Sequence, residues 1–314
     1  MNKLALVSIA LSTHNGEAFL SKQIDSILSQ NYKNIELIIV DDCSTDGTIE
    51  VLNQYKPNAV VKIFQNEQRL GVIKNFEKAI SLCTGEYIAL SDQDDIWKPD
   101  KIEKLISKIK DGILISSDIM LINKNEKIIN PSWFQHQSIY IPESNFMFQA
   151  AVYQNFALGC TMLFKRELVK YIIPIPEKSL SHDWWILVLA SSLGKIKVLR
   201  ESLIMKRIHF FNVSDAGEDN FIIRAKKYFI PKQRKKRVKR YRDSVNRIES
   251  YLSTATIKDE LYRKYLTDLR SYYKGLQTPG IHFNSTIIAF KYRRIFYGGF
   301  NPVIRMIQII AKLF

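Results

Sequence analysis

Apolar and polar positions alternate in blocks along the first third of the chain. Short apolar runs typical of buried strands occur at residues 6–12, 35–40, 59–64, 86–90 and 112–117. Between them, apolar residues recur at helical spacing over residues 17–30, 44–55, 71–83 and 99–109. Strands that alternate with helices in this way predict an α/β fold, with a mostly parallel central sheet covered by helices on both faces.

The pattern changes twice further along the chain. It is less regular over residues 130–215, and beyond residue 220 it becomes basic, tyrosine-rich and helical in spacing. We therefore predict a first domain over residues 1–218, with one half over 1–118 and another over 119–218. A basic helical region is expected over residues 219–314.

The 314-residue chain has a formal net charge of +15, and the excess is concentrated in one segment. Every charged residue from Arg224 to Arg242 is basic. Such a segment favours a polyanion, either nucleic acid or an anionic membrane surface, although a solvated helix face has the same composition. Apolar residues of 303–311 form a helical stripe that also favours membrane contact.

The cysteines and the apolar runs bear on the cellular setting. Cys43, Cys83 and Cys160 are far apart and odd in number, which is typical of a protein in a reducing cytosol. The apolar run near the N-terminus is short and passes into a polar loop, so we expect no signal peptide. No apolar run is long enough to predict a transmembrane helix.

Polar segments follow three of the predicted strands: STHNGE at 12–17, DDCSTDG at 41–47 and SDQDD at 91–95. In parallel α/β sheets, ligands bind beyond the carboxyl ends of the strands, so these segments are expected to form one rim.

The acids of the rim allow two interpretations. Asp92 and Asp94 are two residues apart, so in an extended segment both carboxylates point to one site, where they suit Mg²⁺ or Mn²⁺. Alternatively, Asp95 and its neighbours cap the turn and the helix near Pro99. For Asp41, capping of its own turn is likewise an alternative to ligand binding.

Several common motifs are absent from the sequence. No GxGxxG follows the first strand, no GxxxxGK[ST] occurs, and no GxSxG elbow is present. These absences argue against a dinucleotide dehydrogenase, a P-loop nucleotidase and an α/β-hydrolase.

Three segments taken together resemble family 2 glycosyltransferases, which have the A-type fold with a Rossmann-like nucleotide-binding half. These segments are VSIALSTHNGEAFLSKQIDSILSQNYKNIELIIVDDCSTDGT, GVIKNFEKAISLCTGEYIALSDQDDIWKPDKI and SHDWW. Within the family, the sequence is most similar to bacterial rhamnosyl-, glucosyl- and galactosyltransferases of surface polysaccharide assembly, such as O-antigen or capsule. The resemblance covers residues 5–215 and is loose beyond them.

The resemblance implies roles for individual residues. Nucleotide binding falls to Thr13, Asn15, Glu17, Asp41 and Asp92. The DxD motif is Asp92–Gln93–Asp94, in which Asp94 binds the divalent metal, and His209 is a candidate second ligand. His14 and Lys206 each stand where many relatives carry tyrosine.

The second half carries the implied catalytic base. Asp183 matches the carboxylate that deprotonates the acceptor hydroxyl in inverting members, a role that requires hydrogen-bond reach. Acceptor contacts are expected from His182, Trp184 and Gly159, and diphosphate contacts from Arg69, Lys74 and Arg207. Packing in the core is the alternative for the tryptophans.

The resemblance implies an inverting, metal-dependent transferase that moves a sugar from dTDP-rhamnose, or from UDP-glucose or UDP-galactose, to a lipid-linked saccharide. We expect it to act in the cytoplasm, peripherally on the inner face of the cell membrane, with Mg²⁺ or Mn²⁺ and without a specific nucleic acid partner. Two alternatives remain, a sugar nucleotidyltransferase and a nucleic-acid-binding protein that uses the basic segment. The nucleotidyltransferase would need a glycine-rich basic loop that STHNGE lacks.

Overall fold

The computed structural model describes residues 4–137, 139–142, 144–208, 231–278, 283–292 and 295. The chain forms two compact units. The first comprises Met1–Ile139, Asn155–Glu177 and Ser181–Asn212, and the second comprises Tyr140–Gln154, Lys178–Leu180 and Val213–Phe314. The domain boundary expected at residue 218 lies outside the described residues.

The first unit contains the strands and helices that the sequence predicts in its first third. In chain order they are β1 (Val7–Thr13), α1 (Leu20–Leu28), β2 (Ile35–Asp41), α2 (Thr48–Tyr55), β3 (Val61–Gln65), α3 (Val72–Ser81), β4 (Tyr87–Ser91), α4 (Lys101–Ile109) and β6 (Leu114–Ile122). Each agrees in type with the expected element, and the bounds differ by a few residues at the ends.

The less regular middle of the sequence supplies the remaining elements of this unit. They are β7 (Ile128–Asn130), α5 (Trp133–His136), η2 (Gly159–Thr161), β8 (Met162–Lys165), η3 (Arg166–Leu168), α7 (Val169–Ile172), α8 (His182–Leu193) and β9 (Ile196–Arg207). A two-residue strand that the pattern does not reveal, β5 (Ile96–Trp97), pairs antiparallel with β9. It follows the acidic segment and anchors the end of that segment to the sheet.

The strands form one sheet in the order β3-β2-β1-β4-β8-β6-β9-β5, with β7 paired to β6. Strands β3, β2, β1 and β4 are mutually parallel, and β8 is antiparallel to both of its neighbours. The expected α/β class with a mostly parallel sheet is therefore confirmed. Because β2, β1 and β4 are adjacent and parallel, their carboxyl ends meet at one edge.

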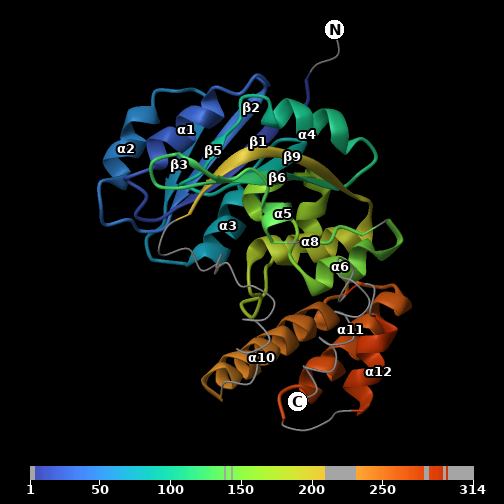
Figure 1. Cartoon of the computed structure of the whole chain (residues 1–314). Coiled ribbons are helices and arrows are strands. Elements are labelled where there is room, and N and C mark those ends of the chain that lie inside the picture. The colour runs from blue at the N-terminus through green and yellow to red at the C-terminus, as the bar shows by residue number, and fades with distance from the viewer. Residues whose placement is uncertain are drawn as a thin grey trace. The chain divides into compact units, whose positions relative to one another are not determined.

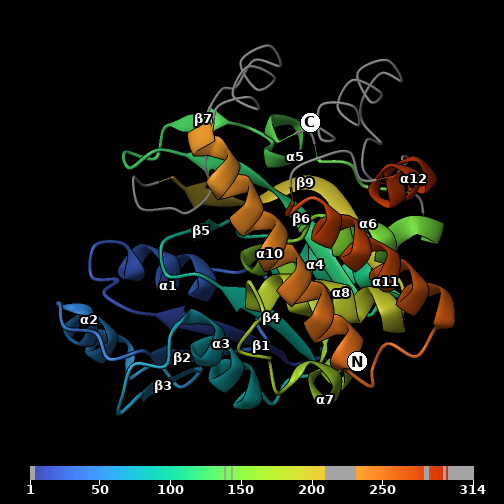
Figure 2. The ribbon, with the colours of Figure 1, turned by 90° about the horizontal axis from the view of Figure 1, so that it is seen from below.

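Helices cover both faces of this sheet (Figure 1). Helices α1, α2 and α4 pack on one face, where Ile9, Ile24 and Leu105 are fully buried in a common core. Helices α3 and α8 contact each other and cover the other face, and Figure 2 shows α3 in front of β1 and β2. Strands buried on both faces consist of nearly continuous apolar residues, which explains the short apolar runs in the sequence.

The second unit is helical. It contains η1 (Ser144–Phe146), α6 (Met147–Tyr153), α10 (Pro231–Ser253), α11 (Glu260–Gly275) and α12 (Phe283–Lys291). Phe148 of α6 stacks on Tyr262 of α11 with ring centroids 4.0 Å apart, and Asp259 caps α11 by accepting from the N–H groups of Leu261 and Tyr262. In the part of the chain that the structure describes, no helix combines the length and apolarity needed to cross a membrane.

Candidate active site

The loop after β1 is joined to the acidic loop after β4 through Gln93. The Thr13 hydroxyl and the His14 N–H both donate to Oε1 of Gln93, at 2.7 and 2.8 Å. In return, Nε2 of Gln93 donates to the His14 carbonyl at 3.1 Å. Gln93, the middle residue of the predicted DxD motif, thus aligns the two loops.

The loop after β1 is also joined to the loop after β2. The N–H of Asn15 donates to the Ser44 hydroxyl at 2.9 Å, and Oδ1 of Asn15 accepts from the Thr45 N–H at 2.8 Å. Oε2 of Glu17 accepts from the Gly47 N–H at 3.0 Å. The three strand-end segments therefore lie together, as the sequence predicts, and part of their polar capacity holds the loops to one another.

The adjacent acids at the end of β2 have different roles. Asp41 is fully buried and accepts from the N–H of Ser44 at 3.0 Å and from its hydroxyl. Asp42 accepts from the N–H groups of Leu70 and Gly71 at 2.7 and 2.8 Å. Burial raises the pKa of Asp42, but these hydrogen bonds outweigh it and hold the pKa below its usual value. Asp42 thus fixes the loop before α3, and Asp41 closes its own turn.

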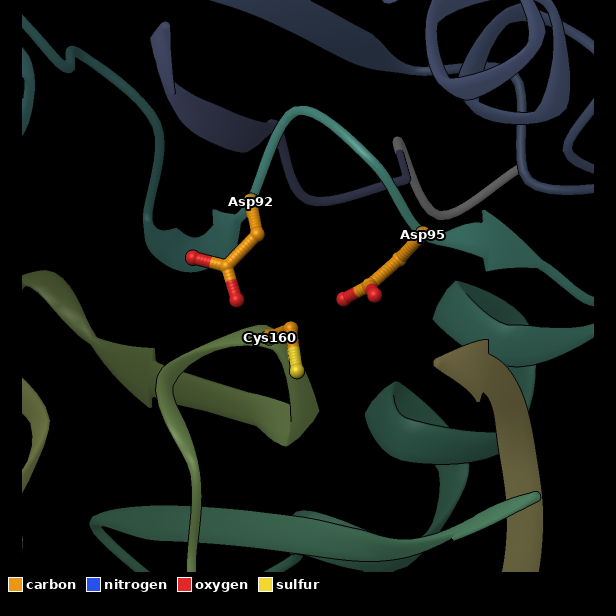
Figure 3. Close-up of side chains that lie close together, drawn as sticks. All are labelled: Asp92, Asp95 and Cys160. Carbon is orange, nitrogen blue, oxygen red and sulfur yellow. The ribbon is translucent and has the colours of Figure 1, made fainter. Parts of the chain in front are cut away.

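Asp92, Asp95 and Cys160 form a compact cluster at the centre of the site (Figure 3). One ligand-type atom from each side chain lies within 4.8 Å of the others. Figure 3 shows the two carboxylates facing each other from the two ends of the acidic turn, with the thiol of Cys160 beside them. Asp95 is 1% exposed, and neither of its oxygens accepts a hydrogen bond from the described residues. The interpretation of Asp95 as a cap is therefore wrong, because its carboxylate points into this cluster instead of toward a backbone N–H.

Two lysines surround the cluster. Nζ of Lys206 lies 2.9 Å from Oδ2 of Asp92 and 3.6 Å from Oδ2 of Asp95. Nζ of Lys101 donates to the Cys160 carbonyl at 2.7 Å and lies 3.2 Å from the ring centroid of Trp97. Two lysine side chains thus accompany the two carboxyl groups.

The burial of this cluster changes its acid–base properties. Burial raises the pKa of Asp95 to about 7, against the opposing effect of Lys206. Burial also raises the pKa of Asp92, but the Lys206 ammonium outweighs it and lowers the pKa. Burial lowers the pKa of Lys101 to about 7. The Asp92–Lys206 pair is thus held in its charged form.

Asp94 lies between the two clustered acids in sequence and is half-buried. Its backbone carbonyl accepts from Nε of Arg207 at 3.3 Å, which fixes the turn. A divalent metal fits this segment, since the half-buried Asp94 carboxylate offers the kind of oxygen ligand that Mg²⁺ and Mn²⁺ prefer. His209, the second predicted ligand, lies outside the described residues.

Asp183 lies in the first turn of α8, which begins after the N-cap Ser181. Its Oδ2 accepts from the Gly159 N–H at 3.0 Å, and its Oδ1 accepts from the Trp184 N–H at 2.7 Å. The neighbouring His182 is 7% exposed and stacks on Phe76 with ring centroids 3.9 Å apart. Burial lowers the pKa of His182, which favours the neutral imidazole.

The three-residue turn η2 connects Asp183 to the acidic loop. Gly159 donates to Asp183, and the next residue, Cys160, belongs to the cluster with Asp92 and Asp95. A Cβ atom on Gly159 would lie 2.9 Å from Nε2 of His182, so the close approach of α8 requires glycine here. The structure therefore brings Asp183 and Asp92 into one site, although they are 91 residues apart.

The three predicted diphosphate contacts have different surroundings. Arg69 is exposed, and Lys74 donates to Glu77 and to the Ile175 carbonyl at 2.9 and 3.0 Å. Arg207 is 1% exposed, and its guanidinium donates to the carbonyls of Asn123 and Lys124 at 3.4 and 3.1 Å. In this structure Arg207 is therefore directed to the protein's own backbone.

The two tryptophans of SHDWW differ in burial. Trp184 is half-buried, whereas Trp185 is 3% exposed and donates from Nε1 to the Ile172 carbonyl at 2.9 Å. Core packing, the alternative considered for the tryptophans, thus holds for Trp185.

Four residues of the site have no role in the sequence analysis: Gln93 as a bridge, Cys160, Lys101 and Lys206. Gln93 is the middle position of the predicted DxD motif, and Lys101 follows that motif in the same matching segment. Cys160 and Lys206 each stand next to a residue with a predicted role, Gly159 and Arg207. For Lys206, the available sequence signal is a basic residue three positions before His209. Its contact with the acidic loop depends on where β9 lies in the sheet.

The sequence matches the family model for glycosyl transferase family 2 over residues 8–173. It is 31% identical over 213 residues to an uncharacterized glycosyltransferase of Nostoc sp., covering 66% of each chain. It is 38% identical over 103 residues to the UDP-Glc:alpha-D-GlcNAc-diphosphoundecaprenol beta-1,3-glucosyltransferase WfaP of Escherichia coli, covering 33% of this chain and 41% of WfaP. It is 28% identical over 193 residues to the dTDP-rhamnosyl transferase RfbG of Shigella flexneri, covering 56% of this chain and 63% of RfbG.

A solved structure supports the fold. The mannosyltransferase PcManGT from Pyrobaculum calidifontis, solved in complex with GDP-Man and Mn²⁺, is similar to this structure with a TM-score of 0.59 at 15% identity, covering 99% of this chain and 86% of that chain. Because the family model matches more than half of the chain, the chain belongs to glycosyl transferase family 2 and has the A-type fold. The matched part spans less than two thirds of the length of each curated relative named above.

Proposed function

We propose that this protein is an inverting glycosyltransferase that moves a sugar from a nucleotide-diphospho donor to a hydroxyl of a lipid-linked saccharide. The observation that carries the proposal is the η2 turn, which brings the carboxylate of Asp183 next to the acidic loop of Asp92 and Asp94. Sugar transfer needs a base for the acceptor hydroxyl and, nearby, acidic residues that hold a metal for the departing diphosphate.

In the proposed mechanism, Asp183 accepts the proton of the acceptor hydroxyl. The oxygen of that hydroxyl attacks the anomeric carbon, the bond from that carbon to the diphosphate breaks, and the nucleoside diphosphate departs with the bonding electrons. The N–H groups of Gly159 and Trp184 hold the carboxylate of Asp183 in one orientation before the reaction. Each of its oxygens retains acceptor capacity for the incoming proton.

On the donor side, Asp41 and Asp92 are the proposed contacts to the nucleoside, together with Thr13, Asn15 and Glu17 of the first loop. Asp94 is the proposed protein ligand of a divalent metal, with His209 as a second candidate. When bound, Mg²⁺ or Mn²⁺ supplies positive charge for the departing diphosphate. Trp184, His182 and Gly159 are proposed to border the acceptor.

The donor is proposed from the relatives. RfbG is named for transfer from a dTDP-rhamnosyl donor, and WfaP is named for transfer of glucose from UDP-Glc to a diphosphoundecaprenol-linked sugar. We therefore propose dTDP-rhamnose first, with UDP-glucose or UDP-galactose next, in the synthesis of a cell-surface polysaccharide.

We also propose that the protein works peripherally at the cytoplasmic face of the cell membrane. Lys235, Lys239 and Arg242 of α10 are exposed, which favours anionic lipid headgroups. On α12, Phe283 and Phe290 are 79% and 63% exposed, as is Ile287 at 57%, while the small residues Ser285 and Ala289 are buried. A helix that turns its large apolar side chains outward fits an interface with lipid better than one with water.

The test is a donor screen with the purified full chain, an undecaprenyl-diphosphate-linked sugar acceptor and Mg²⁺ or Mn²⁺. The expected result is release of a nucleoside diphosphate together with a glycosylated acceptor of inverted anomeric configuration. Release of pyrophosphate from a nucleoside triphosphate and a sugar phosphate would instead identify a nucleotidyltransferase. Retention of the anomeric configuration would rule out Asp183 as the base of a single displacement.

A further inference from the structure

The buried cluster of Asp92, Asp95 and Cys160 has the composition of a metal site, but a protein cation already lies against it. Nζ of Lys206 is 2.9 Å from Asp92, 3.6 Å from Asp95 and 4.0 Å from Sγ of Cys160. A single ammonium group thus contacts all three side chains whose ligand atoms lie within 4.8 Å of one another.

The surroundings explain why a cation is needed at this position. Asp95 is 1% exposed and its two oxygens accept no hydrogen bond from the described residues, so its charge is not compensated by backbone or side-chain donors. A buried carboxylate without a partner is costly, and the Lys206 ammonium is the cation that lies nearest to it in the described residues. Lys206 comes from β9, which pairs with β5 directly after the acidic turn.

The arrangement also affects Asp92. Of the two clustered acids, Asp92 is the one with an exposed edge, since its side chain is 34% exposed whereas that of Asp95 is fully buried. The 2.9 Å charge-assisted hydrogen bond from Lys206 fixes the Asp92 carboxylate from the protein side. The exposed edge of Asp92 is thereby left for the donor.

We propose that Lys206 is a positioning residue that acts as a built-in cation: its ammonium fills a latent metal site of Asp92, Asp95 and Cys160, and orients Asp92 toward the donor. It follows that the divalent metal of the proposed function is confined to Asp94 and the donor side. The part of the proposal that concerns the donor rests on the proposed function, whereas the latent metal site does not.

The ligand set makes the latent site detectable. Two carboxylates and one thiol would hold a soft divalent ion such as Cd²⁺ once the ammonium is removed, and the thiol would lose its proton on binding. Bonding of Cd²⁺ to sulfur produces a charge-transfer band in the ultraviolet, which Mg²⁺ or carboxylate ligands alone do not produce. The band therefore reports on Cys160 without any reference to sugar transfer.

The experiment compares the full-length wild type, Lys206→Ala, Cys160→Ser and the double variant Lys206→Ala/Cys160→Ser, each titrated with Cd²⁺ in thiol-free buffer. We expect Lys206→Ala to gain a saturable band at one equivalent of Cd²⁺, together with a rise in its unfolding temperature. The wild type and Cys160→Ser should give bands of equal strength, because any band from the other cysteines is common to both. The double variant should lack the additional band that Lys206→Ala gains.

A Cys160-dependent band of equal strength in the wild type would overturn the proposal, since the metal would then bind with the ammonium in place. Absence of the band in folded Lys206→Ala would also overturn it. If Lys206→Ala does not fold, Lys206→Gln keeps the length of the side chain without its charge, and the same two outcomes apply to it.

A second readout connects Lys206 to the donor. With the donor found in the screen, Lys206→Gln should raise the KM for the donor by about tenfold or more and change kcat much less, and Lys206→Arg should restore most of the loss. If Lys206→Gln lowered kcat with an unchanged donor KM, the positioning of Asp92 would be refuted. If no donor is used by the wild type, the proposed function fails, and the Cd²⁺ titration still decides the latent site.

Discussion

The backbone N–H of Gly159 donates a 3.0 Å hydrogen bond to Oδ2 of Asp183, and thereby joins the η2 turn to the start of α8. The Trp184 N–H donates to the other oxygen of the same carboxylate at 2.7 Å. Both donors belong to the main chain, one from each of the two elements. The carboxylate is therefore held in one orientation by the backbone.

Replacement of this carboxylate tests its chemical role. In Asp183→Asn the amide oxygen can still accept from a backbone N–H, whereas the amide NH2 group cannot. The substitution removes the base, so kcat should fall by about 10²- to 10⁴-fold. The donor KM should change little, which steady-state kinetics with varied donor will show. Asp259→Asn is a matched control, because Asp259 also accepts backbone N–H groups at a helix start but is the N-cap of α11 in the second unit. A kcat for Asp183→Asn similar to that of the control would contradict the assignment.

The close approach at Gly159 predicts a steric coupling. Gly159→Ala places a Cβ atom 2.9 Å from Nε2 of His182, so the free energy of unfolding should fall by about 1–3 kcal/mol. In a double-mutant cycle with His182→Ala, part of this loss should be recovered, because the clashing ring is absent. Chemical denaturation of the four proteins measures the coupling. Strict additivity of the two substitutions would show that the two residues do not interact.

Metal dependence provides a third prediction. Removal of divalent ions with a chelator should abolish sugar transfer, and Mn²⁺ or Mg²⁺ should restore it in the wild type. Asp94→Ala should not be restored at the same metal concentration, because the proposed protein ligand is lost. Asp111→Ala is the control, since Asp111 is 54% exposed at its side chain and pairs with Lys195 and Lys197 away from the acidic loop. Full activity in the chelated wild type would exclude a metal requirement.

Glu36 predicts how stability depends on pH. This carboxylate is 6% exposed and accepts from Lys62 at 2.8 Å, from the Ser8 hydroxyl at 2.5 Å and from both donors of Thr84 at 2.7 Å. Burial raises the pKa of Glu36, but these hydrogen bonds outweigh it and lower the pKa to about 2. Because the folded-state pKa is below the unfolded value, the stabilisation is complete above the unfolded value of 4.5 and is lost as the pH falls through about 2.

Glu36→Gln should therefore lower the free energy of unfolding by about 2 kcal/mol at neutral pH, and the difference from wild type should shrink steadily below pH 4.5. Urea denaturation at several pH values measures this difference. Glu50→Gln, in the exposed first turn of α2, serves as the control. A difference that stayed constant down to the acid limit would show that Glu36 is not stabilised in its ionised form.

The outward apolar face of α12 predicts lipid binding. The double variant Phe283→Ser/Phe290→Ser should reduce co-sedimentation with vesicles that contain an anionic phospholipid by about tenfold, because two exposed aromatic side chains are removed. Leu261→Ser is the control, since Leu261 is an equally exposed apolar residue of α11. Neutral vesicles should bind the wild type weakly. Preferential, salt-dependent binding to duplex DNA would instead support the nucleic-acid interpretation of the basic segment.

Much of the first unit is predictable from sequence because β1, β2 and β4 are buried on both faces and the edge strand β3 is also rich in apolar residues. Such strands are short apolar runs, so β1, β2, β3 and β4 appear directly in the pattern. The strand-end rule then selects the three polar loops, which the structure brings together. By contrast, β5 has only two residues and no period of its own, and it depends on pairing with β9.

The class of fold, the three polar loops and the candidate acids can be predicted from the sequence, because they depend on local periodicity and on short motifs. The contacts of each acid depend instead on the folded structure. Asp41 closes a turn, Asp95 faces a buried cluster, and Lys206 arrives there from a strand more than a hundred residues away. Contacts of this kind depend on strand order and register, which are set by the packing of the whole sheet and leave no periodic signal in the chain.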